Sequence, residues 1–398
     1  MKPKTLHYGS QYIDDDDINE VLAVLKSDFL SQGPTIREFE EQMAAQTGAE
    51  YCIAVSSGTA ALHLAVKALD IEAGKEGITS PITFVASANS LIYNNLKPVF
   101  ADIDDKTYCL DPRQLEKKIN KNTRVIIPVH FAGQPAEMKE IYEIAKKQGI
   151  FIIEDAAHAI GSRFEDGSLV GACKYSHMTV FSFHPVKTIT TGEGGAITTN
   201  DKKRYEKLSM LRNHGLTRDN SKFRFQPKNS SLTGPWYYEM QELGFNYRIT
   251  DIQAALGKGQ LRKLAGFIKR RREIIAKYNE AFKDLEWLTI PYERPGVFSA
   301  LHLYVIKIDF ERIKKTRAQV MAELKEKAIN TQVHYIPVHL QPYYRENFGF
   351  KEGDFPKGED YYRQCLSIPL YPKMTDDDVH RVIDAVISLC LRRPGGLF

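Results

Sequence analysis

Two short apolar segments near the middle of the sequence, each with polar side chains at its end, restrict the fold more than any other feature. Residues 151–155 have the sequence FIIED, and residues 178–183 have the sequence MTVFSF. Apolar runs of this length predict buried strands. Ligands in open α/β sheets bind outside the carboxyl ends of the strands. Asp155 and Ser182, with Lys187 in the turn that follows, are therefore expected at one edge of one sheet.

The chain around these segments alternates between strand and helix patterns from about residue 51 onward. Further strands are predicted at 51–55, 98–102, 124–129 and 196–199, and helices at 61–69, 137–148 and 202–211. This alternation is typical of a mainly parallel sheet. We therefore expect an α/β fold, with a large domain built on that sheet and a smaller α+β domain after it.

Four segments follow from this interpretation. They are an N-terminal helical segment (1–50), the large domain (51–250), a long connecting helix (251–290) and a small C-terminal domain (291–398). In the first segment, Ile18, Val21, Leu22 and Leu25 fall on one face of a helix. In the last segment, strands are predicted at 301–306 and 332–335, and helices at 317–327 and 376–391. Residues 213–244 form a long loop without a clear period, and loops of this length usually have a functional or interface role.

The turn after the first predicted strand contains only small residues, Ser57-Gly58-Thr59-Ala60. Gly58 lets the backbone approach a ligand closely, and the amides of Thr59 and Ala60 lie at a helix N-terminus, which is a favourable site for a phosphate. An ordinary helix N-cap is an equally good interpretation of the same residues. Phe84 has two interpretations as well, as a core residue or as a ring that stacks on a planar cofactor.

The pairing of an acid with a lysine at one sheet edge indicates pyridoxal phosphate (PLP) chemistry. Asp155 would keep the pyridine nitrogen protonated, and Lys187 would hold the cofactor aldehyde covalently. The simpler alternative is that Lys187 is a surface lysine beside the glycine turn at 192–195.

Composition and charge exclude several other classes. The formal net charge of +4 is small and dispersed, which argues against nucleic-acid binding. The cluster Lys269–Arg272 lies within a helical pattern and is expected on a solvated or interface face. The five cysteines are odd in number and lack metal-type spacing, so free thiols in a reducing cytoplasm and no metal site are expected. The N-terminus lacks the apolar run of a signal peptide, and no stretch approaches the ~18 apolar residues of a membrane span.

Several motifs in register along nearly the whole chain resemble the DegT/DnrJ/EryC1/StrS family of PLP-dependent sugar aminotransferases. They are SSGTAAL at 56–62, EDAAHA at 154–159, SFHPVK at 182–187, GEGG at 192–195 and GFNYR at 244–248. The resemblance implies the fold of a type I PLP-dependent transferase. Some relatives have histidine in place of the lysine and dehydrate sugars. Because Lys187 is present here, the resemblance implies transamination.

The resemblance also implies a role for individual residues. Lys187 would carry the cofactor and move the proton between cofactor and substrate carbons, with Asp155 on the pyridinium nitrogen and Phe84 on the ring face. Gly58, the amides of Thr59 and Ala60, and the hydroxyl of Ser182 would hold the phosphate. Asn246 would reach that phosphate from the neighbouring subunit, which implies a homodimer with shared active sites. His158 stands near the cofactor's phenolic oxygen, where many relatives have glutamine, and its protonation state is open.

Segments near both ends resemble, more narrowly, the aminotransferases of the pseudaminic acid pathway. Examples are SDFLSQGP at 27–34 and VHYIPVHLQPYY at 333–344. This likeness implies amino transfer from L-glutamate to UDP-2-acetamido-2,6-dideoxy-β-L-arabino-hexos-4-ulose. The expected substrate-binding residues are Tyr8, Phe29, Ser31, Ser57, Arg248, His339 and Gln341. For Arg248, the diphosphate, the donor carboxylate and an interface ion pair are all open interpretations.

Three alternatives stay open at this point. The same chemistry would suit another nucleotide-4-ketohexose, of the bacillosamine, perosamine or aminoarabinose type. A PLP-binding protein without turnover would be expected to carry an added DNA-binding domain, and the sequence has no such pattern. A dehydrogenase would need a GxGxxG turn after the first strand, whereas residues 56–59 read SSGT.

Overall fold

The computed structural model describes residues 4–225 and 234–390, and its centre is a seven-stranded sheet. The strands are β1 (Tyr51–Val55), β2 (Glu76–Thr79), β3 (Lys97–Phe100), β4 (Thr123–Ile127), β5 (Phe151–Asp155), β6 (Met178–Ser182) and β7 (Gly195–Thr199). Their order is β1-β7-β6-β5-β4-β2-β3, and β7 runs antiparallel to both of its neighbours while the other pairs are parallel. The prediction of a mainly parallel α/β sheet is confirmed.

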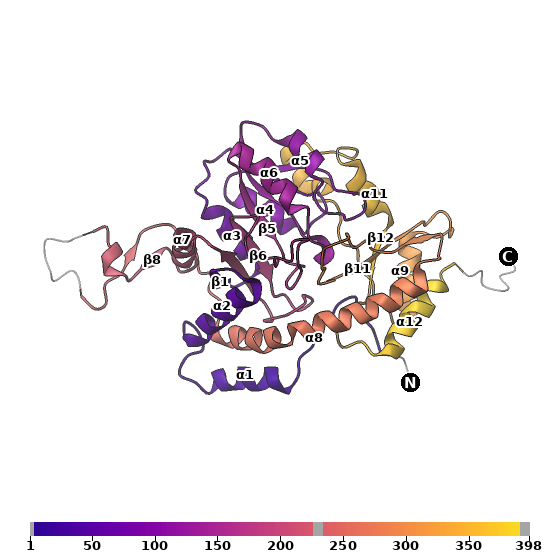
Figure 1. Cartoon of the computed structure of the whole chain (residues 1–398), viewed down its shortest axis with the longest axis horizontal. Helices are drawn as coiled ribbons and strands as arrows, with labels where there is room; N and C mark the ends of the chain where they lie inside the picture. The colour runs from indigo at the N-terminus through magenta and orange to yellow at the C-terminus, as the bar shows by residue number, and fades with distance from the viewer. Residues whose placement is uncertain (1–3, 226–233, 391–398) are drawn as a thin grey trace.

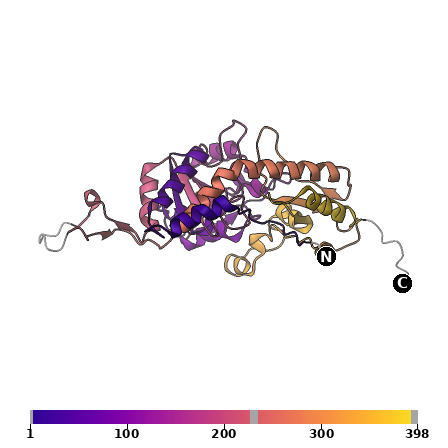
Figure 2. The same ribbon diagram turned by 90° about the horizontal axis from the view of Figure 1, so that it is seen from below.

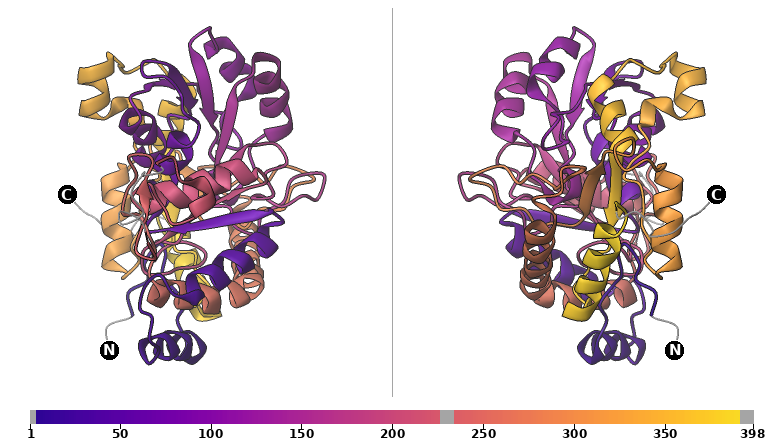
Figure 3. Two further views of the ribbon diagram at one scale, coloured as in Figure 1. Left: turned by 90° about the vertical axis from the view of Figure 1, so that its left-hand side faces the viewer. Right: turned by 90° about the vertical axis from the view of Figure 1, so that its right-hand side faces the viewer.

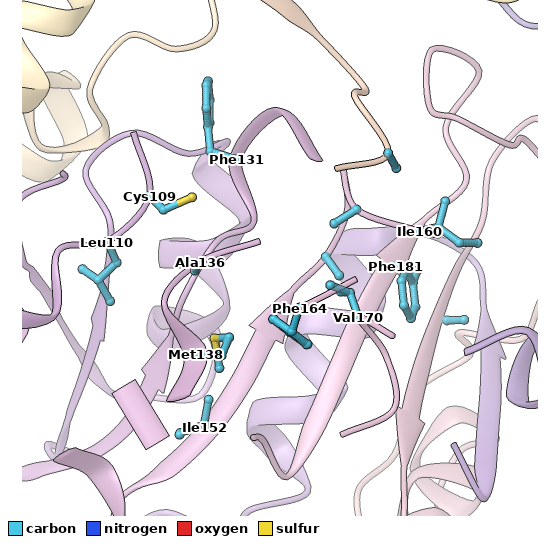
Figure 4. Packing of buried hydrophobic residues seen from close by; sticks show 14 of the residues in the cluster. Cys109, Leu110, Phe131, Ala136, Met138, Ile152, Ile160, Phe164, Val170 and Phe181 are labelled. Atoms are coloured by element: carbon cyan, nitrogen blue, oxygen red, sulfur yellow. The ribbon is translucent and has the colours of Figure 1, made fainter. Parts of the chain in front are cut away.

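Helices cover both faces of this sheet because its strands are apolar on both faces (Figures 1 and 3). Along β6, Val180 packs with one buried cluster and Phe181 with another. The Val180 cluster includes residues of α3 (Gly58–Lys67), α4 (Val85–Tyr93) and α7 (Lys202–Arg212). The Phe181 cluster includes residues of α2 (Pro34–Thr47), α5 (Pro112–Lys118) and α6 (Met138–Gln148) (Figure 4). Burial on both faces explains why these strands read as continuous apolar runs.

One long helix, α8 (Asp251–Phe282), runs across the lower part of the molecule in Figure 1, above α1. Its 32 residues begin at a capping box formed by Thr250 and Gln253. The buried carboxylate of Asp251 accepts hydrogen bonds from the backbone N–H groups of Gly33 (2.8 Å), Thr35 (3.0 Å) and Ile36 (3.4 Å). A side chain at residue 33 would lie 2.5 Å from the Cβ of Phe29, so the turn before α2 requires glycine. Asp251 thus joins the start of α8 to the start of α2.

Helix α1 (Asp15–Leu25) packs on α8 through its polar side. Asp14 and Asp17 both bind the ammonium group of Lys263, and the carboxylate of Asp17 is fully buried. The expected apolar face of this helix therefore points outward, with Ile18 55% and Leu25 52% exposed. The sequence predicted the apolar face of this helix but not that this face would point to solvent.

The C-terminal part contains a three-stranded antiparallel sheet of β10 (Leu288–Thr289), β11 (Tyr304–Ile308) and β12 (Cys365–Ile368), beside α9 (Arg317–Glu326) and α12 (Asp376–Ile387). Its core also includes Tyr278 and Phe282 from the end of α8. The strand expected at 301–306 begins only at Tyr304. The strand expected at 332–335 is wrong, because only Gln332 forms a bridge, to Ser367, and the following residues turn toward the large sheet.

The segment from 338 to 364 packs against the edge of the large sheet, and its last helix also contacts β11 of the small sheet. It contains the 3₁₀ helix η4 (Val338–Leu340), α10 (Pro342–Phe348) and α11 (Pro356–Gln364). Val338 and Tyr344 pack with Phe100 of β3, and the Asp102 carboxylate accepts the N–H groups of Lys357 and Gly358 at 2.9 Å each. This packing holds residues 332–341 over the carboxyl ends of the parallel strands.

The predicted long loop extends away from the body of the molecule, at the left of Figures 1 and 2. Two short strands, β8 (Leu216–Thr217) and β9 (Glu239–Met240), pair at its base, and residues 226–233 lie outside the described part. Trp236, Met240 and Leu243 are exposed along this arm.

Candidate active site

A cavity of about 580 Å³ opens at the carboxyl ends of the parallel strands. Its volume is in the range of small-molecule sites. Strand ends and the turns after them form its floor, and Tyr8 and residues 332–336 form part of its wall. Ten of the sequence-predicted site residues line it: Tyr8, Ser57, Gly58, Thr59, Phe84, Asp155, His158, Ser182, Lys187 and Gln341.

Asp155 ends β5 with its carboxylate buried at the cavity floor. The Ser87 hydroxyl donates to its Oδ2 at 2.6 Å, and the Ala157 N–H donates to its Oδ1 at 3.1 Å. Each oxygen keeps a lone pair for a further donor. A fixed carboxylate with spare acceptor capacity suits the protonated nitrogen of a pyridinium ring.

The turn between β1 and α3 forms the cradle expected for a phosphate. A Cβ at Gly58 would lie 2.8 Å from the Cβ and 3.1 Å from the Oγ of Ser182, so only glycine fits where β6 ends. The N–H groups of Gly58 and Thr59 belong to the first turn of α3 and lack partners within the helix. The Ala60 N–H, also expected to bind phosphate, already donates the N-cap hydrogen bond to the Oγ of Ser57 at 3.0 Å. Ala60 does not line the cavity, whereas Ser57, Gly58, Thr59 and Ser182 do.

Lys187 lies in the turn between β6 and β7, and its side chain lines the cavity. Burial lowers the pKa of its amine from 10.5 to about 8, although the negative charge of Asp155 acts in the opposite direction. A lysine with this pKa is partly neutral near physiological pH and can act as a nucleophile, unlike a surface lysine. The residues thus fit PLP: an acid for the ring nitrogen, a cradle for the phosphate and a lysine for the aldehyde.

The depressed pKa of Lys187 predicts how protein freed of PLP will take the cofactor up again. With a pKa of about 8, the neutral amine rises from about a tenth of the total at pH 7 to about nine tenths at pH 9. We expect the rate of covalent PLP capture, followed by rapid-mixing absorbance, to rise over this interval with a midpoint near pH 8. A rate that keeps rising tenfold per unit beyond pH 9 would show that burial does not lower the pKa of this amine.

His158 lies beneath the cavity as a neutral ring. Burial lowers the pKa of its imidazole well below the usual value, and the charge on Lys187 lowers this pKa further. Its Nδ1 accepts the backbone N–H of Ala132 at 3.3 Å, and its Nε2 lies 3.1 Å from the Tyr335 hydroxyl. The question of its protonation state, which the sequence left open, is therefore answered by its surroundings.

Phe84 precedes α4 at the cavity wall and is 57% exposed, which excludes the interpretation as a core residue. Its ring is free to contact a planar ligand. Stacking on the cofactor ring remains a prediction.

Four predicted residues lie away from this cavity and gather around a second, smaller hollow. Arg248 lines that hollow together with Gln32, Gly33 and Arg212. Phe29 and Ser31 belong to the adjoining turn, and Asn246 pairs with Asn213 at its rim. The structure of one chain therefore does not bring Phe29, Ser31, Asn246 or Arg248 to its own Lys187.

The expectation that His339 contacts the substrate is contradicted. His339 is fully buried in η4, and its Nε2 lies 3.0 Å from the Glu359 carboxylate. Its neighbour Gln341 does line the cavity. His339 supports the segment that carries Gln341, because the Glu359 carboxylate also accepts the backbone N–H groups of Gly353 at 2.9 Å and Phe355 at 3.3 Å.

Several cavity residues were missed by the sequence reasoning. Ser87, which lies behind the cavity wall, holds Asp155, and its sequence context gives no signal for this role. His302, His334 and Tyr335 come from the C-terminal part and surround Lys187 from the other side. Burial and the Lys187 charge lower the pKa of both histidines, that of His334 to about 3. The motif at 333–344 indicated that this segment is functional, but not which of its side chains face the cavity.

Among residues 4–225 and 234–390, no cluster of three histidine, cysteine, aspartate or glutamate side chains could hold a metal ion. Over the same ranges, none of the helices is both long and apolar enough to cross a membrane.

Comparison with known proteins gives a consistent result. The sequence matches the DegT/DnrJ/EryC1/StrS aminotransferase family over residues 11–387. It is 42% identical over 382 residues, 96% of each chain, to the spore coat polysaccharide biosynthesis protein SpsC of Bacillus subtilis.

Solved structures agree in fold. Helicobacter pylori PseC, an aminotransferase involved in the biosynthesis of pseudoaminic acid, superposes with a TM-score of 0.89 at 30% identity, covering 97% of this chain and 99% of PseC. The PLP form of Spr1654, a sugar aminotransferase from Streptococcus pneumoniae, gives a TM-score of 0.87 at 27% identity, covering 97% and 98%.

Proposed function

This chain belongs to the DegT/DnrJ/EryC1/StrS aminotransferase family, and from that membership we propose that it transfers an amino group from L-glutamate to C4 of a UDP-linked 4-keto-6-deoxy-N-acetylhexosamine. The chain is a sugar aminotransferase with PLP as its cofactor. The observation that supports the reaction best is the presence of Lys187, with a pKa of about 8, and Asp155 in one cavity.

Each residue of the site has a separate role in the proposed reaction. PLP supplies an electron sink for the carbon that loses or gains a proton. Asp155, held by Ser87 and Ala157, keeps the positive charge on the ring nitrogen. Ser182 and the first amides of α3 would anchor the phosphate, and Phe84 would contact the ring. The amine of Lys187 holds the cofactor at rest and moves the proton during each half of the reaction.

For the acceptor we propose UDP-2-acetamido-2,6-dideoxy-β-L-arabino-hexos-4-ulose, the ketosugar of pseudaminic acid biosynthesis. Support comes from the motifs at 27–34 and 333–344 and from the likeness to PseC over 97% of this chain. The higher identity to SpsC favours a second candidate, the same amino transfer to another nucleotide-linked 4-ketosugar.

The test of the substrate uses the absorbance of the bound cofactor. L-glutamate should bleach the visible band of the PLP-loaded enzyme, and excess donor is then removed. If the L-arabino ketosugar restores the band and the D-xylo isomer does not, the pseudaminic acid assignment holds. Restoration by the D-xylo isomer alone would support the amino-transfer reaction but would make the D-xylo ketosugar the substrate.

We also propose that two copies share each active site. Phe29, Ser31, Asn246 and Arg248 lie outside the cavity of their own chain, and this arrangement suits contribution to a partner's cavity. Among the residues that the structure describes, no arginine lines the cavity of one chain, whereas arginine is the usual partner of a diphosphate and of the carboxylates of glutamate.

Mixed dimers test the shared site. Asn246→Ala alone should weaken PLP retention, measured by dialysis, because a phosphate contact is lost. A heterodimer is then formed from one Lys187→Ala chain and one Asn246→Ala chain. If the active sites are shared, both defects fall in one site and the other site is intact. About half of the wild-type activity should therefore return. Activity no higher than that of the Asn246→Ala homodimer would show that each chain supplies its own asparagine.

A cytoplasmic location is part of the proposal. All five cysteines are free, four of them buried and Cys390 exposed. Free thiols are typical of proteins in a reducing compartment. The substrates proposed, a UDP-sugar and L-glutamate, are small molecules that require no further macromolecular partner.

A further inference from the structure

Tyr335 lines the cavity, and its hydroxyl reaches His158, which lies just after the end of β5. Its ring lies 6.2 Å from the ring of Phe84 and 6.1 Å from that of His158, to which it is nearly parallel at 14°. The Tyr335 oxygen lies 3.1 Å from the Nε2 of His158. Among the residues that the structure describes, His158 is its one hydrogen-bond partner.

The direction of this hydrogen bond follows from the other side of the imidazole. The backbone N–H of Ala132 can only donate, so the Nδ1 of His158 accepts. A buried imidazole with a depressed pKa carries a single proton, which must therefore be on Nε2. That proton is donated to the oxygen of Tyr335.

The hydroxyl proton of Tyr335 can therefore be donated in a hydrogen bond to a ligand. Burial raises the pKa of this phenol well above its usual value, so the hydroxyl keeps its proton throughout the working pH range. Tyr335 is partly buried and lines the cavity, and its hydroxyl has no protein acceptor among the described residues, so a ligand that displaces water from the cavity has to supply one. The side chain is held by His158 and Phe131, which lies edge-on to both rings.

We propose that Tyr335 donates a hydrogen bond to an oxygen of the bound ligand, with His158 as the positioning residue behind it. This oxygen is either the phenolic oxygen of PLP or the C4 carbonyl oxygen of the ketosugar. Both are acceptors whose negative charge must be stabilised for the reaction to proceed. The proposal rests on the PLP site of the proposed function. In this arrangement His158 contacts Tyr335, whereas the sequence had placed it against the phenolic oxygen of PLP.

Tyr335→Phe in the PLP-loaded full chain separates the two oxygens, because it removes only the hydroxyl. If the acceptor is the cofactor oxygen, the pH midpoint of the visible band without substrate should rise by about one to two units, since a donor to the anionic form is lost. If the acceptor is the sugar carbonyl, that midpoint should stay unchanged. The kcat/KM of the ketosugar half-reaction should then fall about 10- to 100-fold, while the glutamate half-reaction keeps its rate.

Tyr344→Phe is the matched control. Tyr344 is also a buried tyrosine whose hydroxyl makes a hydrogen bond, to Asn89 at 2.6 Å, but it does not line the cavity. This variant should show neither change. Unfolding temperatures of both variants identify any general loss of stability.

The role of His158 is tested by a double-mutant cycle. His158→Phe removes the donor behind Tyr335, so Tyr335→Phe should have a smaller effect in that background than in the wild type. A Tyr335→Phe enzyme with the wild-type pH midpoint and both wild-type half-reactions would overturn the proposal. Absence of any visible band in the wild-type protein with PLP would instead refute the proposed function.

Discussion

Lys187→Ala is expected to abolish turnover and covalent PLP binding while leaving the fold intact. Its side chain ends in the cavity, so its removal leaves no space in the hydrophobic core. Loss of the proton-transfer group alone costs about 10²- to 10⁴-fold, and loss of the covalent attachment adds to it. Borohydride treatment followed by mass measurement should fix PLP to the wild type and not to the variant.

Lys174→Ala is the control for this change, since Lys174 is an exposed lysine that pairs with Asp166 outside the cavity. It should keep both covalent PLP and full activity. Circular dichroism and the unfolding temperature of Lys187→Ala without PLP should match those of the wild type without PLP. Wild-type turnover in Lys187→Ala would contradict the assignment of the nucleophile.

Asp155→Asn has the second-largest expected effect. The change keeps the shape of the side chain and removes the charge that stabilises the protonated ring, and losses for such preorganised groups are about 10²- to 10³-fold in kcat. Because the Asp155 charge raises the pKa of Lys187, its removal should also move the pH midpoint of PLP capture below 8. Rapid-mixing absorbance measures both effects on one preparation.

Asp166→Asn provides the comparison, because Asp166 lies outside the cavity and pairs with Lys174. Neither its kcat nor its midpoint of PLP capture should change. An Asp155→Asn enzyme with wild-type kcat would show that the ring nitrogen does not depend on this carboxylate.

The large sheet could be predicted from sequence because its signals are local. Strands such as Phe151–Asp155 are continuous apolar runs, and their polar ends mark the edge where ligands bind. Parallel pairing then brings Asp155 and Ser182 together without any knowledge of distant contacts. The family motifs added the roles of residues within those same turns.

The features that could not be predicted depend on contacts between distant parts of the chain. Helix α1 has the apolar stripe that the sequence shows, but Lys263 binds Asp14 and Asp17 and so turns the stripe outward. His339 lies in a motif beside Gln341, yet the Glu359 carboxylate, twenty residues later, pairs with it in the interior. Tyr335 acquires its partner, His158, from a strand end 177 residues earlier in the chain.

The carboxylate of Asp251 has a consequence for exchanging parts between relatives. It binds three amides of the turn that contains Gly33 and also starts the helix that leads to the C-terminal part. Under the proposed function, the turn at 27–34 would be the segment to transplant in order to change sugar preference. A graft that lacks either the glycine or the acid would lose its anchor, so the two positions, 218 residues apart, have to be exchanged as one unit.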